Sequence, residues 1–358
     1  MDNFINYKIN VGNLMQNIEK VKQKICGRKF CAVVKSDCYG LGVENVVPYI
    51  DSVVDVYAVS NVGECKRLRE ITKKKILLLS EVFSDDLVYC VNNNVSVSVG
   101  RIETLKMIKN TVTQTINIHI KINTGMNRYG IRDKKELGEC LKIIDNCNTI
   151  NLEGVFTHFA TAGSDIRFFE KQYKTFEEML KNVPQNGLLI HCNNSSAAIT
   201  LGVEHGNMVR VGFGMYGEIT NDIGLKKVLT ITAKILTFVR VKKGECVGYD
   251  LSYVAEKDLK LAVVGMGYAD GFSRRLSNKF NVLVNGCWAR VVGYVCMDCF
   301  MVDVTDIRDV DVGDEVIVLG ASGKHDISLD DYAKCLETSP YEVLVGFSRK
   351  RAEIELIT

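Results

Sequence analysis

Residues 32–40 read AVVKSDCYG, and this stretch decides how the rest of the chain is interpreted. The apolar run before Lys35 is typical of a strand covered on both faces, as in a parallel sheet. Ligands usually bind at the carboxyl ends of such strands. Lys35 either extends its ammonium into water from a strand end or is a buried amine. Desolvation lowers the pKa of a lysine and makes it nucleophilic toward a carbonyl, such as the aldehyde of pyridoxal 5'-phosphate (PLP).

Eight apolar segments have the length and composition of strands. They cover residues 30–35, 56–60, 75–81, 95–99, 115–123, 152–159, 188–194 and 208–217. Charged segments between them, including 62–71, 133–145 and 168–180, have apolar residues every three or four positions, which predicts helices. Eight alternations of strand and helix predict an α/β fold with an N-terminal (β/α)8 TIM barrel. An open doubly wound sheet is the alternative, although no GxGxxG follows the first strand.

The chain changes character after about residue 222. Segments 226–245, 259–271, 280–295 and 299–306 alternate in polarity, are rich in β-branched residues and are separated by turn sequences. Helical spacing returns only in a short patch near residue 330. We therefore predict two domains, a PLP-binding barrel over residues 1–225 and a mostly-β domain over residues 226–358.

Composition limits the kind of protein this is. The chain has 358 residues, 47% of them hydrophobic, and a formal net charge of +2, so a polybasic nucleic-acid surface is not expected. Its 13 cysteines are an odd number scattered along the chain, which does not suit a secreted disulfide framework or a zinc ribbon. No apolar stretch is long enough to span a membrane. We expect a soluble cytoplasmic protein without a bound metal.

Polar residues follow the last two predicted barrel strands, where barrel active sites lie. Asn194 and Ser195 follow the seventh strand and could cap the next helix and bind an anion. Arg210 lies in the eighth strand, and Gly212 and Phe213 follow it. A glycine-rich turn at this position, beside a polar cap, is a common phosphate site.

Two other strand ends carry candidate residues. Lys121 and Arg128 lie at or after the end of the fifth strand. His158 lies at the end of the sixth. This histidine is either a core residue with satisfied hydrogen bonds or part of a site.

Taken together, these motifs resemble those of alanine racemase. AVVKSDCYG, KINTGMNRYG, THFA, HCNNSSAA, MVRVGFGMYG, GMGYADG, CMD and SPYEVL come in the order and approximate spacing of that family, over nearly the whole chain. The resemblance implies a homodimer that interconverts L-alanine and D-alanine with PLP, a reaction that supplies D-alanine to the cell wall. It also implies a (β/α)8 barrel followed by a C-terminal β domain.

The resemblance implies roles for individual residues. Lys35 would be the Schiff-base lysine, and Tyr249 the catalytic tyrosine contributed by the partner subunit. Arg210 would face the pyridine nitrogen, with His158 hydrogen-bonded to it. The implied phosphate contacts are Tyr39, Ser195, Gly212, Phe213 and Tyr341. The implied substrate-pocket residues are Arg128, with the often carbamylated Lys121 behind it, and Tyr268 and Met297.

The sequence departs from the family pattern at several positions. Leu41 stands where the family usually has a histidine, and Asp37 replaces a common asparagine. The tail FSRKRAEIEL differs from the usual ending. The context GYDLSY leaves Tyr253 as the alternative to Tyr249 for the catalytic tyrosine.

Other functions remain open at this point. A serine racemase or a basic-amino-acid racemase or decarboxylase could have the same fold. Arg210 argues against decarboxylases, which are expected to place a carboxylate at the pyridine nitrogen, and Tyr341 favours a methyl-sized side chain. A non-catalytic PLP carrier would need Lys35 but not Tyr249. A barrel of unknown use is the remaining alternative.

Overall fold

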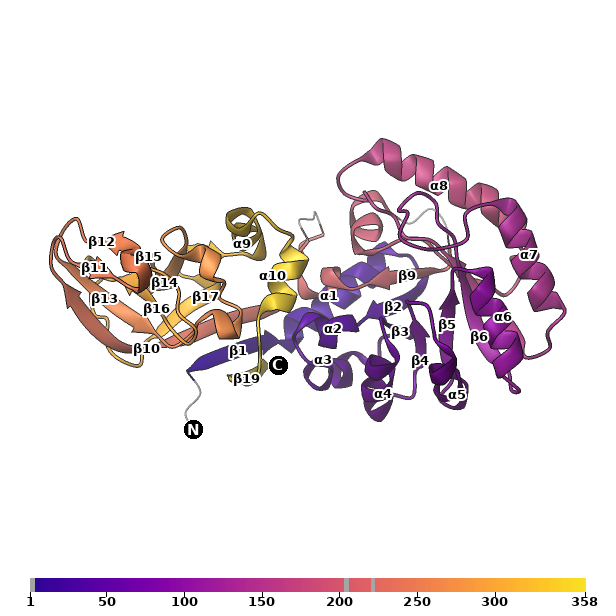
Figure 1. Ribbon diagram of the computed structural model, residues 1–358, viewed down its shortest axis with the longest axis horizontal. Coiled ribbons are helices and arrows are strands. Elements are labelled where there is room, and N and C mark those ends of the chain that lie inside the picture. Colours follow the sequence, from indigo (N-terminus) through magenta and orange to yellow (C-terminus); the bar gives the residue numbers. More distant parts are fainter. Residues whose placement is uncertain (1–3, 203–205, 220–222) are drawn as a thin grey trace. The chain divides into compact units, whose positions relative to one another are not determined.

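The computed structural model describes residues 4–202, 206–219 and 223–358 (Figure 1). The chain divides into two compact units. The unit that we call the barrel unit comprises Met15–Cys38 and Gly42–Lys226. The unit that we call the β unit comprises Met1–Leu14, Tyr39–Leu41 and Lys227–Thr358.

The barrel unit is built on a parallel sheet of eight strands, in the order β8-β7-β6-β5-β4-β3-β2-β9. Each strand falls within one of the eight segments predicted from sequence, or within two residues of it. The strands are β2 (Lys29–Val33), β3 (Val56–Val59), β4 (Lys75–Leu78), β5 (Val95–Val99), β6 (Ile116–Lys121), β7 (Ile150–Phe156), β8 (Leu189–His191) and β9 (Met208–Val211).

The sheet closes into a nearly complete barrel. The first barrel strand, β2, pairs with the last, β9, over residues 29–32 and 208–211. Between β8 and β9, the N–H of Asn207 donates to the carbonyl of Ile190 (3.0 Å), and that of Arg210 to the carbonyl of Asn193 (3.1 Å). The barrel prediction is therefore confirmed, and the open doubly wound alternative is wrong.

Helices follow the strands and lie around the outside of the barrel (Figure 1). They are α1 (Val11–Lys24), which begins in the β unit, and α3 (Val43–Ile50), α4 (Val62–Ile71), α5 (Ser84–Asn92), α6 (Ile102–Thr111), α7 (Lys134–Asp145) and α8 (Ile166–Leu180). The side chains of Asn61 and Asp133 accept hydrogen bonds at the first turns of α4 and α7, as polar caps do. The helical spacing predicted at 62–71, 133–145 and 168–180 corresponds to α4, α7 and α8.

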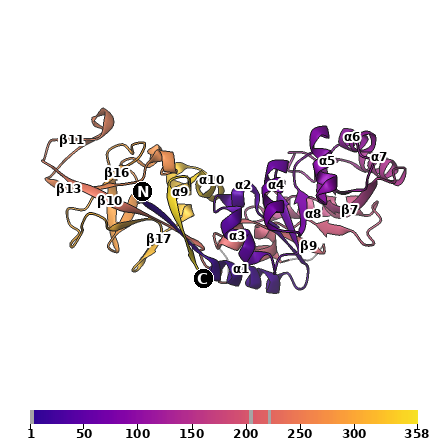
Figure 2. The same ribbon diagram turned by 90° about the horizontal axis from the view of Figure 1, so that it is seen from below.

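The β unit contains the other long sheet, in which β10 pairs with β1, β13 and β17 (Figure 2). The strands are β1 (Ile5–Asn10), β10 (Leu229–Val241), β13 (Leu259–Val264), β14 (Asn281–Val284), β15 (Cys287–Val292), β16 (Phe300–Asp303), β17 (Glu315–Ser322), β18 (His325–Ile327) and β19 (Ala352–Ile357). A small hairpin pairs β11 (Cys246–Val247) with β12 (Tyr253–Val254). The two helices are α9 (Leu329–Leu336) and α10 (Pro340–Gly346).

Six of these strands form a closed ring. The pairings run from β10 to β13, β16, β15, β14 and β17, and β17 pairs again with β10. Buried aromatic side chains pack beside this ring, and the rings of Phe272 and Phe300 stack with centroids 4.1 Å apart. The mostly-β C-terminal domain predicted from sequence is therefore confirmed.

The N-terminal strand differs from the domain division predicted from sequence, which placed it with the barrel. β1 pairs antiparallel with β10 and parallel with β19, and both belong to the β unit. Ile5, Tyr7 and Ile9 are buried and alternate with partly exposed residues. This alternation suits a sheet with one covered face, whereas strands of a parallel barrel are covered on both faces.

No helix in the part of the chain that the structure describes is long and apolar enough to cross a membrane.

Candidate active site

Lys35 lies just beyond the end of β2, followed by a left-handed turn. Residues 36–39 all have φ between 52° and 56°, although none of them is a glycine. Each such residue costs roughly 1–2 kcal/mol relative to a right-handed conformation. The turn, labelled α2 (Lys35–Tyr39), closes through a hydrogen bond from the N–H of Cys38 to the carbonyl of Val34 (3.0 Å).

Two carboxylates hold this turn in place. Glu64 at the start of α4 accepts from the N–H of Ser36 (2.8 Å) and from that of Ser60 (2.8 Å). Asp37 accepts from the N–H of Val43 (3.0 Å) and lies 3.0 Å from the guanidinium of Arg67. The departure at Asp37 thus provides a charged anchor for the loop that carries Lys35.

The pKa of the Lys35 amine is lowered, which favours its action as a nucleophile. Burial lowers its pKa, the cationic Arg128 lowers it further, and Glu64 opposes both. The buried residues Cys31 and Val33 precede it at alternate positions of β2 and belong to a cluster with residues of β3, β4 and β9. Of the two readings of Lys35, the structure favours the partly desolvated amine.

Arg210 is a fully buried cation at the centre of the barrel unit. Its Nη1 donates to the ring Nδ1 of His191 (2.8 Å) and to the carbonyl of the same residue (2.7 Å). Its Nη2 donates to the carbonyls of Thr157 (2.7 Å) and Cys192 (3.2 Å), and lies 3.3 Å from Nδ1 of His158. Its Nε–H makes no hydrogen bond with any described residue, so one donor remains for a ligand.

The two histidines beside Arg210 are neutral. Burial and the nearby guanidinium lower the pKa of His158 and of His191 well below the ordinary value. Both accept from Arg210 through Nδ1, so each carries its proton on Nε2. Because His158 contacts Arg210 at the end of β7, it is part of the candidate site and not merely a core residue.

A buried relay that sequence reasoning missed runs down the barrel from Arg210. Nε2 of His191 lies 2.8 Å from Nδ1 of His119, and Nε2 of His119 lies 3.1 Å from Glu153. Glu153 also accepts from the hydroxyl of Ser96 (2.5 Å) and forms an ion pair with Lys75. The relay therefore runs from a guanidinium to a carboxylate through two neutral imidazoles.

The position of the His119 ring explains why residue 154 of β7 is a glycine. A Cβ at Gly154 would lie 2.5 Å from Nδ1 of His119 and 2.6 Å from the carbonyl of Leu189. A side chain at Gly154 would therefore displace the imidazole. The sequence contains one indication that His119 belongs near the site. It precedes Lys121 by two residues, so both side chains point to the same face of β6.

Ser195 and the turn after β9 form a small polar cradle. The hydroxyl of Ser195 accepts from the N–H groups of Gly212 (2.9 Å) and Gly214 (3.3 Å). Asn194 instead accepts from the N–H of Ala197, at the first turn of a five-residue π-helix (Ala197–Leu201). Phe213 is buried. The predicted phosphate residues after β8 and β9 therefore lie together.

Lys121 and Arg128 lie near the aromatic ring of Tyr129. Nζ of Lys121 is 3.3 Å from the ring centroid, and the guanidinium carbon of Arg128 is 5.8 Å from it. Burial and the cations Arg128 and Arg210 lower the pKa of Lys121 to about 7. Arg128 is exposed and makes no hydrogen bond with the described residues, which leaves its guanidinium available to an anion.

The remaining predicted residues belong to the β unit. Tyr39 is buried, and its ring lies 6.4 Å from that of Tyr341. Leu41, where the family pattern has a histidine, is also buried, so it serves as a core residue here. The structure thus brings Tyr39 and Tyr341 together, as expected for two contacts to one group.

Tyr249, Tyr268 and Met297 are exposed residues on loops of the β unit. Their side chains are 65%, 41% and 54% exposed. Tyr249 begins a short turn in which Asp250 has a φ of 55°. Tyr253 is instead partly buried against a cluster that includes Val247. Exposure therefore favours Tyr249 as the tyrosine that can reach another molecule.

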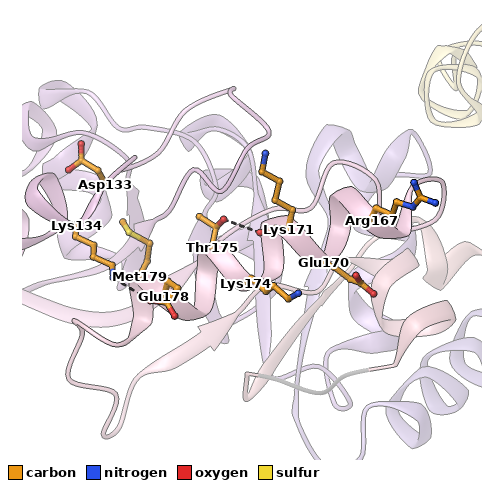
Figure 3. Close-up of a pocket in the computed structure, with 9 residues that line it drawn as sticks. All are labelled: Asp133, Lys134, Arg167, Glu170, Lys171, Lys174, Thr175, Glu178 and Met179. Atoms are coloured by element: carbon orange, nitrogen blue, oxygen red, sulfur yellow. Dashed lines mark hydrogen bonds and ion pairs between the residues drawn. The ribbon is translucent and has the colours of Figure 1, made fainter.

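The large groove on the barrel unit lies away from these residues. Figure 3 shows it along α8, where Arg167, Lys171 and Lys174 alternate with Glu170 and Glu178. Charges of both signs line it, and none of the predicted site residues does.

The donors in the barrel unit fit PLP. An amine with a lowered pKa can hold an aldehyde, and the Ser195 cradle offers a hydroxyl to a phosphate. The open Nε–H of Arg210 suits a ring nitrogen that accepts a hydrogen bond. The described residues contain no group of three or more His, Cys, Asp or Glu side chains that could hold a metal ion.

Two family models match the chain along most of its length. The model described as "Alanine racemase, N-terminal domain" matches residues 9–220, and the model described as "Alanine racemase, C-terminal domain" matches residues 228–354. A relative named alanine racemase, from Vesicomyosocius okutanii, is 35% identical, and the match covers 96% of each chain.

Solved structures agree with these matches. The alanine racemase from E. faecalis superposes with a TM-score of 0.92 at 31% identity, over 99% of this chain and 98% of that one. The alanine racemase from Bartonella henselae, solved with covalently bound pyridoxal phosphate, superposes with a TM-score of 0.88 at 25% identity, over 99% of this chain and all of that one.

The relay predicts how stability depends on pH. Although burial raises the pKa of Glu153, hydrogen bonds from His119, Lys75 and Ser96 outweigh it and lower the pKa to about 2. A lowered folded-state pKa stabilises the protein above the ordinary value of 4.5, and this stabilisation is lost as the pH falls toward 2. Glu153→Gln should therefore cost about 1–3 kcal/mol of unfolding free energy at pH 7.

Urea unfolding at several pH values checks this prediction. The difference between wild type and Glu153→Gln should narrow as the pH falls below about 4.5. The control Glu139→Gln removes an exposed carboxylate from α7 and should stay within about 0.5 kcal/mol of wild type. A difference that stays constant as the pH falls from 7 through 4.5 toward 2 would show that the charge of Glu153 is not what stabilises the relay.

Proposed function

Since this chain belongs to the alanine racemase family, we propose that it interconverts L-alanine and D-alanine with PLP as its cofactor, using Lys35 and Tyr249 to move the α-proton. The observation that carries this proposal is the position of Arg210. It is a buried cation with one open donor, in the same barrel as an amine of lowered pKa. When bound, PLP withdraws electrons from the α-carbon of an amino acid and so makes its proton removable.

We assign the cofactor contacts by the resemblance to the alanine racemase family. The Lys35 amine would bind its aldehyde carbon, and Ser195 with the Gly212 and Phe213 turn would bind its phosphate. Tyr39 and Tyr341, whose rings lie 6.4 Å apart, would complete the phosphate site. Asn194 would support this site by capping the turn that follows Ser195.

Arg210 would donate its Nε–H to the pyridine nitrogen. A guanidinium stays charged at physiological pH and therefore disfavours a second positive charge on the nitrogen beside it. His158 and His191 are neutral and accept from Arg210, so they orient the guanidinium without adding charge. This arrangement limits side reactions that begin from a protonated pyridine ring.

Racemisation requires a proton to leave one face of the α-carbon and to arrive on the other. We assign one face to Lys35 and the other to the partner subunit's Tyr249. Each group should contribute on the order of 10²–10⁴ to the rate. The high exposure of Tyr249 suits a residue that functions against a second copy of the chain.

The substrate would be held by a cation and confined by bulky side chains. Arg128 would bind the carboxylate of the amino acid. Lys121 has a pKa of about 7, so much of it is the neutral amine that carbon dioxide requires to form a carbamate. Tyr268 and Met297 would narrow the space for the substrate side chain.

We further propose that the protein acts as a cytoplasmic homodimer with shared active sites. All thirteen cysteines are free thiols, which is the usual state in a reducing compartment. A two-fold symmetric dimer forms two equivalent sites, each with residues from both chains.

A racemisation assay on a panel of L-amino acids tests the reaction. With purified protein and added PLP, alanine should be racemised fastest, by about tenfold or more over serine, because Tyr268, Met297 and Tyr341 restrict the pocket. Lys35→Ala should have no activity, and its spectrum should lack the band of cofactor bound covalently to lysine. A serine or lysine rate well above that of alanine would contradict the assignment and favour the alternative substrates.

Mixing two inactive variants tests the shared site. Lys35→Ala and Tyr249→Phe chains should each be nearly inactive alone. After equal mixing and subunit exchange, half of the dimers should be mixed, each with one intact site, so activity should recover to about a quarter of wild type. No recovery, when exchange is shown by mass spectrometry of the intact dimers, would count against a site built from two chains.

Hydrogen exchange at the α-carbon tests the two assigned groups separately. By the family's pattern, Lys35 handles the proton of the D-form and Tyr249 that of the L-form. In deuterated solvent, Tyr249→Phe should slow exchange of L-alanine by about 10²–10⁴ while D-alanine still exchanges through Lys35. Tyr253→Phe is the matched control and should keep both exchanges. Equal loss for both enantiomers in cofactor-loaded Tyr249→Phe would refute the assignment of two groups.

A further inference from the structure

Two cysteines flank a residue of the proposed substrate pocket. Cys296 and Cys299 stand on either side of Met297 and Asp298, in the loop between β15 and β16. We propose that these two thiols are a reversible oxidation site, which closes to a disulfide and then misplaces Tyr268 and Met297. This proposal rests on the proposed function, because the loss of activity that it predicts requires that pocket.

The backbone holds the two cysteines opposite each other. The N–H of Cys296 donates to the carbonyl of Cys299 at 2.9 Å, across a four-residue bend. A full antiparallel pair exchanges two such bonds and has Cα atoms about 5.5 Å apart, which is also the separation most often found in disulfides. Cys296 and Cys299 share one of these two bonds. A disulfide could therefore form here by a change confined to the loop.

The thiols already interact in the reduced protein. The Cys296 thiol donates to the carbonyl of Tyr294 (3.6 Å), and its sulfur is near enough to Cys299 to affect the ionisation of that thiol. Burial, the Cys296 sulfur and Asp298 raise the pKa of Cys299. We take Cys296 as the attacking sulfur and Cys299, whose thiol is harder to ionise, as the resolving one.

The reaction balances with a peroxide as the oxidant. The Cys296 thiolate attacks one oxygen of hydrogen peroxide, forming an S–O bond while the O–O bond breaks, and the departing hydroxide takes up a proton. The Cys299 thiol then loses its proton and attacks the Cys296 sulfur, forming the S–S bond and releasing a second water. Two thiols are oxidised and one peroxide is reduced to two waters. A dithiol reductant reverses the oxidation by two thiol exchanges.

The loop is tightly connected to the turn that carries Tyr268. The carbonyls of Cys296 and Met297 accept from the N–H groups of Tyr268 and Ala269, both at 3.0 Å. The contact is so close that a Cβ at Gly267 would lie 2.2 Å from the carbonyl oxygen of Met297. Drawing the two sulfurs into a bond would therefore move the acceptors that position the Tyr268 turn.

A salt-bridge network keeps the rest of the loop fixed. Arg351 donates two hydrogen bonds to buried Asp270, at 2.8 and 2.6 Å, and one to Asp298 at 2.5 Å. Asp298 lies between the two cysteines, and Asp270 ends the Tyr268 turn. Because Arg351 holds both aspartates, a movement of the loop on disulfide formation would be transmitted to the Tyr268 turn.

Other cysteines do not share this combination of features. Cys65 and Cys90 are near enough to influence each other's charge, but both are fully buried. Cys246 and Cys287 are exposed and serve as comparison thiols. Cys296 and Cys299 are half-buried, which leaves them open to a small oxidant.

Peptide mass analysis identifies the bond without reference to activity. Cleavage after Arg290 and Arg308 releases residues 291–308, which contain Cys296 and Cys299 and no other cysteine. After the PLP-loaded enzyme is treated with peroxide and its remaining thiols are blocked, this peptide should lack two hydrogens and carry no blocking group. Oxidation of Met297 would instead add an oxygen atom, so the two modifications are distinguishable.

Activity measured on the same samples tests whether the disulfide slows racemisation. Racemisation should fall by roughly ten- to a hundredfold as the disulfide forms, and dithiothreitol should restore it. Cys299→Ser, compared with its own reduced activity, should not lose activity in this reversible way, whereas Cys287→Ser should behave as wild type. The wild-type peptide measurement stands by itself if Cys299→Ser fails to fold.

Three results would overturn the inference. They are the absence of the disulfide in the peptide when activity has fallen, a disulfide that leaves the rate unchanged, and equal reversible loss in Cys299→Ser. A reduced enzyme that racemises no amino acid would instead refute the proposed function, and the peptide would still report whether the bond forms.

Discussion

The buried charge of Arg210 is the constraint on which much of the barrel unit depends. Burying an unpaired guanidinium costs several kcal/mol, so its N–H groups need acceptors. Three backbone carbonyls at the ends of β7 and β8, together with the rings of His158 and His191, are arranged to supply them. The histidines can serve only as neutral rings, because a protonated imidazole cannot accept through Nδ1. The barrel interior is consequently polar along one line of side chains and apolar around it.

A second constraint is the conformation after β2. Four successive left-handed residues are costly, and the structure offsets this cost with hydrogen bonds to Glu64 and Asp37. In the β unit, the closed ring of strands likewise supports exposed loops, and the ion pairs of Arg351 join two of them. In both units, residues proposed for chemistry lie on strained or exposed segments, and regular elements hold these segments in place.

The sequence by itself determined the architecture. Eight strand segments alternating with helices predict an α/β fold and favour a barrel, because two-sided burial and helical spacing are local patterns that any window of the chain displays. Lys35 and Arg210 could be predicted as well, since they lie at strand ends and in motifs that resemble one family. The relay through His119 and Glu153 could not, because these residues stand on different strands and nothing in their local sequence pairs them.

Tertiary structure decided the matters that depend on which segments meet. Pairing of β2 with β9 closed the barrel and excluded an open sheet, and pairing of β1 with β10 drew the N-terminal strand into the β unit. The neutral state of His158 and the lowered pKa of Lys121 arise from burial in the folded barrel unit and from the cation Arg210, which is distant from both in sequence. Sequence patterns report local periodicity and burial, whereas electrostatics and hydrogen-bond partners depend on distances that exist only in the folded chain.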